Sequence, residues 1–132
     1  MNDRIRVLHV DDDPDLAALT GSFLERENDR ITVETAPNAT AGLDRLDAGG
    51  VDCVVSDHDM PGPNGIEFLE SVRERDPDLP FILYTGKGSE SVASEAVSAG
   101  VSDYLAAALA VVAVVGAVVA VLRVGGGDAH AA

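Results

Sequence analysis

The stretch Cys53–Gly65, with the sequence CVVSDHDMPGPNG, decides the fold of this chain. Its first residues are apolar and predict a buried strand that leads up to Asp57. A loop rich in proline, glycine and asparagine follows at once, and such loops mark the point where a strand ends. The pattern therefore predicts that Asp57 is presented at the tip of a buried strand, where its carboxylate is available for chemistry.

Similar apolar runs recur along the chain and alternate with helical patterns. Strands are expected at about 4–10, 31–36, 52–56, 81–84 and 102–105, and helices at about 14–26, 38–47, 65–75 and 89–99. This alternation predicts right-handed βαβ units and an α/β fold, namely a doubly wound five-stranded parallel sheet with helices on both faces.

The first helix has the clearest local signals. Pro14 suits the first helical position and Asp13 its N-cap. The apolar residues of this helix are expected to face inward, and they are Leu16, Leu19, Phe23 and Leu24.

Polar residues follow three of the predicted strands. Asp11 and Asp12 come after the first, Asp57 after the third and Thr85 after the fourth. In a parallel sheet these strand ends share one edge, where functional groups gather. Three carboxylates brought together repel one another and need a cation, and Mg²⁺ prefers such oxygen ligands. The sequence therefore predicts a Mg²⁺ site where Asp57 attacks an incoming phosphoryl group in line and the Thr85 hydroxyl donates a hydrogen bond to it.

Four motifs in this order resemble the receiver domain of two-component response regulators. They are the DD-P segment at 11–14, VVSDHDMPGPNG, LYTG and SAGVSDYL, and the likeness covers residues 4–105. The resemblance implies a flavodoxin-like receiver fold with strand order 2-1-3-4-5. It also implies a phosphorelay protein that is not a turnover enzyme. Its partners would be a histidine kinase or phosphotransfer protein and a downstream target or output domain.

The resemblance also assigns roles to individual residues. It implies that Asp57 is the phosphoacceptor and one of the residues at the Mg²⁺ site. The other implied roles are the Mg²⁺-binding acidic pair Asp11 and Asp12, a further metal ligand in the backbone carbonyl of Asp59, the switch hydroxyl of Thr85 and the switch aromatic Tyr104.

One departure from the family pattern concerns a lysine. The family carries a lysine shortly after the aromatic of the fifth strand, and its place here is taken by Ala107. Lys87, the only lysine of the chain, follows Thr85 and is a candidate substitute. A phosphorylation-impaired pseudo-receiver that acts as an interaction module is therefore an alternative function.

An enzyme is a second alternative. Haloacid-dehalogenase-like phosphatases also use an Asp-x-Asp motif after a strand, as in Asp57-His58-Asp59. Their motif belongs to the first strand, however, and such a function leaves Asp11 and Asp12 unexplained.

The end of the chain does not fit a receiver. Residues 104–122 contain no charged side chain, whereas a final receiver helix should be amphipathic. Three interpretations are open: a membrane-spanning segment, an apolar helix whose outer face forms an oligomer interface such as a homodimer, and an altered reading frame. The expected divisions are a receiver core at 1–105, an atypical apolar helix at 106–123 and a flexible tail at 124–132.

Composition sets outer limits on function. The 132 residues suit one domain, and their net charge of −14 argues against direct nucleic acid binding. Cys53 is the only cysteine, so an internal disulfide is excluded. The N-terminus has no long apolar run of the kind found in signal peptides, so a cytoplasmic protein is expected. With no output domain recognisable after residue 105, the chain is expected to be a stand-alone receiver or one module of a longer protein.

Overall fold

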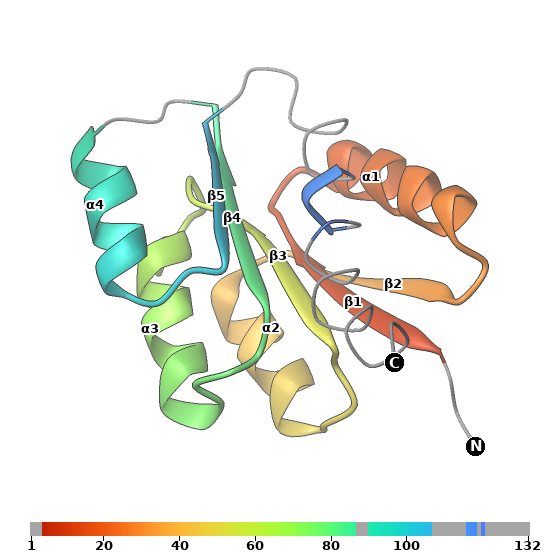
Figure 1. Cartoon of the computed structure of the whole chain (residues 1–132), viewed down its shortest axis with the longest axis horizontal. Helices are drawn as coiled ribbons and strands as arrows, with labels where there is room; N and C mark the ends of the chain where they lie inside the picture. The colour runs from red at the N-terminus through yellow and green to blue at the C-terminus, as the bar shows by residue number, and fades with distance from the viewer. Residues whose placement is uncertain (1–3, 87–89, 107–115, 119, 121–132) are drawn as a thin grey trace.

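The computed structural model describes residues 4–86, 90–106, 116–118 and 120 (Figure 1). Within them, strands and helices alternate along the chain. In order they are β1 (Ile5–Val10), α1 (Pro14–Glu27), β2 (Ile31–Ala36), α2 (Ala39–Asp47), β3 (Cys53–Asp57), α3 (Gly65–Arg75), β4 (Phe81–Thr85), α4 (Glu90–Ser98) and β5 (Asp103–Ala106).

The strands form one parallel sheet in the order β2-β1-β3-β4-β5, as predicted. Helices α2, α3 and α4 cover one face of the sheet, and α1 covers the other (Figure 1). The register places Val10 of β1 opposite Ser56 of β3, and Asp57 opposite Tyr84 of β4. The residues that follow β1 and those that end β3 and β4 therefore meet at the same edge.

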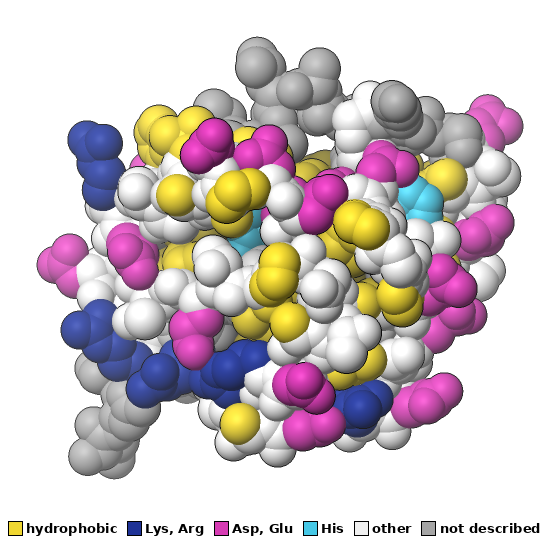
Figure 2. All heavy atoms as spheres, turned by 180° about the vertical axis from the view of Figure 1, so that it is seen from behind, with side chains coloured by type: hydrophobic (Ala, Val, Ile, Leu, Met, Phe, Trp, Pro, Cys, Tyr) yellow, Lys and Arg dark blue, Asp and Glu magenta, His cyan; other side chains and the backbone are white. Residues whose placement is uncertain are grey.

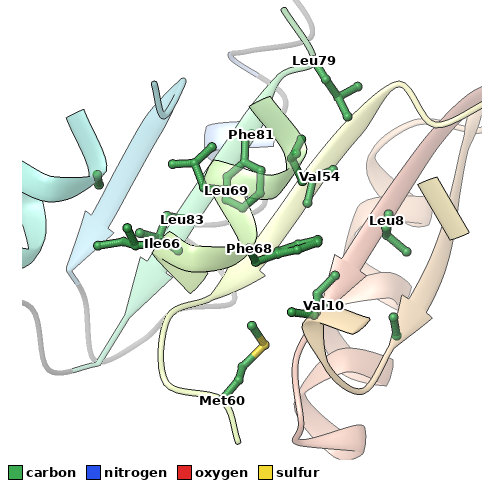
Figure 3. Packing of buried hydrophobic residues seen from close by; sticks show 14 residues of the cluster. Leu8, Val10, Val54, Met60, Ile66, Phe68, Leu69, Leu79, Phe81 and Leu83 are labelled. Carbon is green, nitrogen blue, oxygen red and sulfur yellow. The ribbon is translucent and has the colours of Figure 1, made fainter. Parts of the chain in front are cut away.

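Alternate strand residues contribute to a separate core on each face of the sheet. Figure 3 shows the core beneath α2, α3 and α4, where Phe68 of α3 packs on Phe81 with ring centroids 5.5 Å apart. We call this the first core. The second core lies beneath α1 and contains Val7, Val55 and Ile82. Strands that are buried on both faces explain why β3 and β4 read as continuous apolar runs.

Part of the segment after β5 belongs to the second core. Residues 116–118 are helical, and Ala117 and Val118 are buried against the α1 face of the sheet. The rest of the predicted 106–123 helix beyond Ala106, apart from residue 120, and the 124–132 tail lie outside the described residues. Among the residues that are described, no helix has the length and apolar character needed to cross a membrane.

The expectation for the inner face of α1 was partly wrong. Leu24 is buried and Leu16 packs against the second core, but Leu19 and Phe23 are 49% and 41% exposed. The buried stripe instead consists of Ala17, Thr20, Gly21 and Leu24. These residues also have helical spacing, and their small members let the helix lie close to the sheet. A Cβ added at Gly21 would lie 3.4 Å from the Val33 side chain, in ordinary van der Waals contact.

Candidate functional site

Three carboxylates converge beyond the carboxyl ends of β1 and β3. Asp11 follows β1 and is buried, Asp12 is exposed, and Asp57 is the half-buried last residue of β3. One oxygen from each lies within 4.8 Å of the others. The predicted meeting of Asp11, Asp12 and Asp57 is therefore present in the structure.

The loop after β3 is held firmly behind Asp57. The backbone N–H of His58 donates to the carbonyl of Tyr84 at 2.9 Å, which ties the loop to β4. The N–H of Gly65 then donates to the carbonyl of His58 at 3.0 Å and closes the loop. Helix α3 begins there with a reciprocal capping box between Asn64 and Glu67. These contacts fix the backbone from which the Asp57 side chain projects.

Electrostatics at the site favour a cation. Burial, followed by the negative charge of Asp11, raises the pKa of Asp57 to about 7. The N–H of Asp59 opposes this rise by donating to Oδ1 of Asp57 at 3.2 Å. A carboxyl group with such a pKa is poorly compensated by its protein surroundings, and a bound cation would favour its ionised form.

Thr85 ends β4 at the same edge of the sheet as these carboxylates, as expected. It is fully buried at the end of β4, and its hydroxyl donates to Oδ2 of Asp59 at 2.8 Å. The side chain of Asp59 is therefore a partner of Thr85, a contact that the sequence did not predict. A metal-ligating role of the Asp59 carbonyl stays a prediction.

Tyr104 is placed on β5, one strand beyond β4. Its ring is partly buried against the first core, and its hydroxyl is buried without a hydrogen-bond partner in the described part of the chain. Its role as a switch aromatic stays a prediction. Lys87 and Ala107, the two positions that bear on the missing lysine, lie outside the described residues.

Two further residues reach the site, and sequence reasoning missed their role. The Tyr84 hydroxyl donates to Oδ2 of Asp11, and Nε2 of His9 lies 2.7 Å from the same hydroxyl. The signal was present in the strand alternation. His9 and Asp11 follow Val7 at intervals of two residues, so the alternation puts them on the same face of the sheet as Val7, the face beneath α1. Tyr84 follows Ile82 by two residues and is on that face as well.

The donor set fits Mg²⁺. All three converging side chains are carboxylates, and no sulfur or imidazole ligand, which a softer metal would prefer, is among these three. A site with three carboxylates also leaves room for waters and a phosphate oxygen, which Mg²⁺ commonly retains.

Comparison with known proteins identifies the family. A family model described as the response regulator receiver domain matches residues 7–118. The chain belongs to the response regulator receiver family. The receiver fold and the phosphoacceptor function implied by the sequence motifs are thereby confirmed, and a haloacid-dehalogenase-like phosphatase is not favoured.

Curated relatives of this receiver are regulators. It is 37% identical over 100 residues to the C4-dicarboxylate transport transcriptional regulatory protein DctD of Rhizobium meliloti, covering 76% of this chain and 21% of DctD. It is 32% identical over 100 residues to the transcriptional regulatory protein ResD of Bacillus subtilis, covering 76% of this chain and 40% of ResD. The receiver thus spans less than half the length of either relative.

Solved structures show the same fold. A CheY-like receiver domain protein from Methanospirillum hungatei superimposes with a TM-score of 0.85 at 25% identity, covering 95% of this chain and 98% of that one. The response regulator TrrA of Thermotoga maritima, in complex with Mg²⁺ and BeF, gives a TM-score of 0.70 at 28% identity, covering 80% and 88%. TrrA in that complex therefore shares the fold of this receiver.

Proposed function

We propose that this receiver accepts a phosphoryl group on Asp57 from a histidine kinase or a phosphotransfer protein. The observation that carries the proposal is the convergence of Asp11, Asp12 and Asp57 within 4.8 Å at the strand ends. Mg²⁺ is the cofactor that this acidic site and the family indicate. When bound, it supplies positive charge that offsets the charges of the carboxylates and the phosphoryl group.

The transfer itself requires little covalent chemistry from the protein. An Asp57 carboxylate oxygen attacks the phosphorus of a phosphohistidine, the new O–P bond forms as the P–N bond breaks, and the leaving imidazole takes up a proton. Asp11 and Asp12 would hold the cofactor, and the loop behind Asp57 keeps the attacking oxygen in place. Positioning and charge neutralisation are then the main sources of acceleration.

Readout of the phosphoryl group is proposed to pass through Thr85 and Tyr104. The Thr85 hydroxyl would exchange its present acceptor, Asp59, for a phosphoryl oxygen, and Tyr104 on the neighbouring strand would follow. The signal would then reach a downstream protein or an output domain, as expected for a chain that matches only part of its longer relatives.

The proposal also covers the location of the protein in the cell and its binding partners. We place the receiver in the cytoplasm, as a signalling phosphoacceptor with self-catalysed transfer and dephosphorylation and without steady turnover of substrates. Figure 2 shows acidic side chains spread over one face of the molecule, with basic side chains gathered along its lower part. The net charge of −14 disfavours direct contact with nucleic acid. Homodimerisation through the outer face of the apolar segment 104–122 is a further proposal, with Ala117 and Val118 on its inner face.

The test is covalent labelling of the purified chain by acetyl phosphate with and without Mg²⁺, followed by intact mass measurement. The expected result is one added phosphoryl group that requires Mg²⁺ and is lost in Asp57→Asn. Asp15→Asn, at an exposed position in the first turn of α1, is the matched control and should label normally. Labelling that persists in Asp57→Asn would contradict the proposed acceptor.

Ala107→Lys addresses the departure from the family pattern. If the missing lysine impairs a competent site, the variant should accept the phosphoryl group faster than the natural sequence in the same assay. Equal rates would show that position 107 does not limit phosphorylation. Absence of labelling in both proteins would favour the pseudo-receiver alternative.

A further inference from the structure

Tyr84 and His9 form a buried polar chain that leads to Asp11. The hydroxyl of Tyr84 donates to Oδ2 of Asp11, and Nε2 of His9 lies 2.7 Å from that hydroxyl. His9 is 0% exposed, and Tyr84 and Asp11 are each 4% exposed. Polar groups buried to this degree are costly unless they are hydrogen-bonded. The three side chains therefore depend on one another.

The number of protons available decides which group donates in each of these hydrogen bonds. A phenol carries one proton, which is used toward Asp11, so the Tyr84 oxygen accepts from an Nε2–H of His9. This assigns a neutral His9 with its proton on Nε2, a tautomer inferred from the hydrogen bonds. Nδ1 of His9 then carries no proton, and among the described residues it makes no hydrogen bond within the usual limits of distance and angle.

The surroundings of the two rings are consistent with a neutral His9 and with a Tyr84 hydroxyl that keeps its proton. Burial lowers the pKa of His9 and so favours the neutral ring, although the charge of Asp11 and the nearby backbone of Ala17 oppose the shift. Burial and then the hydrogen bond to Asp11 raise the pKa of Tyr84, so its hydroxyl keeps the proton that it donates.

Both oxygens of Asp11 are held in this arrangement. Oδ1 accepts the backbone N–H of Asp13 at 2.8 Å, and Oδ2 accepts the Tyr84 hydroxyl. Each carboxylate oxygen has two lone pairs, so each keeps one for a cation. The plane of the carboxylate is thereby set from two sides by the protein alone.

We propose that Tyr84 and His9 are positioning residues of the metal site. The Nε2–H of His9 orients the Tyr84 hydroxyl, and this hydroxyl holds Asp11 ready for a divalent cation. The inference rests on the proposed function in one respect, namely that Asp11 binds the metal. Hydrogen-bond partners of metal ligands commonly tune affinity in this way.

The test is a Mn²⁺ titration of the full chain, followed by the electron paramagnetic resonance signal of free Mn²⁺. Tyr84→Phe keeps the ring and removes the hydroxyl, and we expect it to lower Mn²⁺ affinity about tenfold. His9→Leu should lower affinity to a smaller extent. His9→Gln places an N–H donor near the same point and should restore binding to near the natural value.

A double variant tests whether the two residues act in series. If His9 acts only through the Tyr84 hydroxyl, Tyr84→Phe combined with His9→Leu should bind Mn²⁺ no more weakly than Tyr84→Phe alone. Additive losses would overturn the serial arrangement.

Thr20→Val is the matched control, because it removes the hydroxyl of a residue that is 2% exposed and lies in α1, outside the acidic site. It should leave Mn²⁺ affinity unchanged even if it lowers the melting temperature. Unchanged affinity in Tyr84→Phe would overturn the positioning role while leaving the metal site intact. Failure of the natural chain to bind Mn²⁺ would overturn the metal site and the positioning role together.

Discussion

At the residue scale, the surroundings of Asp57 disfavour its ionised form. Its pKa of about 7 has burial as the main cause and the charge of Asp11 as the second. Because the ordinary value is 3.8, the folded, metal-free protein binds this proton more tightly than the unfolded chain does. The contribution of Asp57 to stability is therefore favourable in acid relative to neutral pH, and it declines as the pH rises from about 4 to about 7.

Asp57→Asn should consequently raise the melting temperature of the metal-free protein at pH 8 by several degrees, because it removes a poorly compensated charge. The gain should shrink at pH 5, where the natural side chain is largely protonated. Thermal unfolding with a chelator present measures both values. Glu27→Gln, at an exposed position at the end of α1, separates this effect from a general loss of negative charge. An equal gain at both pH values would contradict the raised pKa.

Sequence reasoning predicted part of the site and not the rest, for a physical reason. Asp11, Asp12, Asp57 and Thr85 were predicted because strand ends converge whatever the side chains do. The contacts of Tyr84 with Asp11 and of Thr85 with Asp59 depend on side-chain reach and rotamer. Tyr84 also sits in an apolar run, where a tyrosine reads as core packing and its hydroxyl gives no periodic signal.

At the scale of elements, the junction between the β3 loop and α3 allows no side chain at Gly65. A Cβ added there would lie 2.6 Å from the carbonyl oxygen of Asp57 and 2.5 Å from Cδ1 of Leu83. The helix therefore begins in direct contact with the backbone that carries the acceptor.

Gly65→Ala should destabilise the protein by about 1–3 kcal/mol, since either the loop or the helix must move. It should also slow labelling of Asp57 by acetyl phosphate. Gly21→Ala is the matched control, because its Cβ would meet Val33 at an ordinary 3.4 Å and alanine favours a helix. Urea unfolding of both variants checks the contrast. A Gly65→Ala variant as stable as Gly21→Ala would refute the close approach.

The elements themselves were predicted well where local signals were strong. Asp13 caps α1, as the sequence indicated, because capping is a short-range interaction between a side chain and nearby N–H groups; Asn38 caps α2 in the same way. The inner face of α1 was predicted less well. Leu19 and Phe23 are larger than Ala17 and Gly21, but the small residues face the sheet because they permit closer packing.

At the scale of the whole molecule, charge is the dominant feature. A net charge of −14 on a single domain implies self-repulsion that favours expansion. Salt shortens the range of this repulsion, from a Debye length of about 10 Å at 0.1 M to about 3 Å at 1 M.

We therefore expect the melting temperature of the metal-free protein to rise when KCl is increased from about 0.1 M to about 1 M. The rise should be smaller at pH 5, nearer to the isoelectric point of about 4.2, because fewer carboxylates are charged. Thermal unfolding at the two pH values and two salt concentrations gives all four numbers. A salt effect independent of pH would point to a cause other than repulsion among acids.

The contact between Tyr84 and Asp11 also gives the molecule an optical property. The chain has no tryptophan and two tyrosines, so its ultraviolet emission comes from Tyr84 and Tyr104 alone. A phenol that donates to a carboxylate emits weakly, and a cation on Asp11 would change the charge that this hydroxyl faces. Tyrosine fluorescence should therefore change in intensity as Mg²⁺ is added, and Tyr104→Phe should leave that change in place, which makes the natural chain its own unlabelled indicator of metal occupancy.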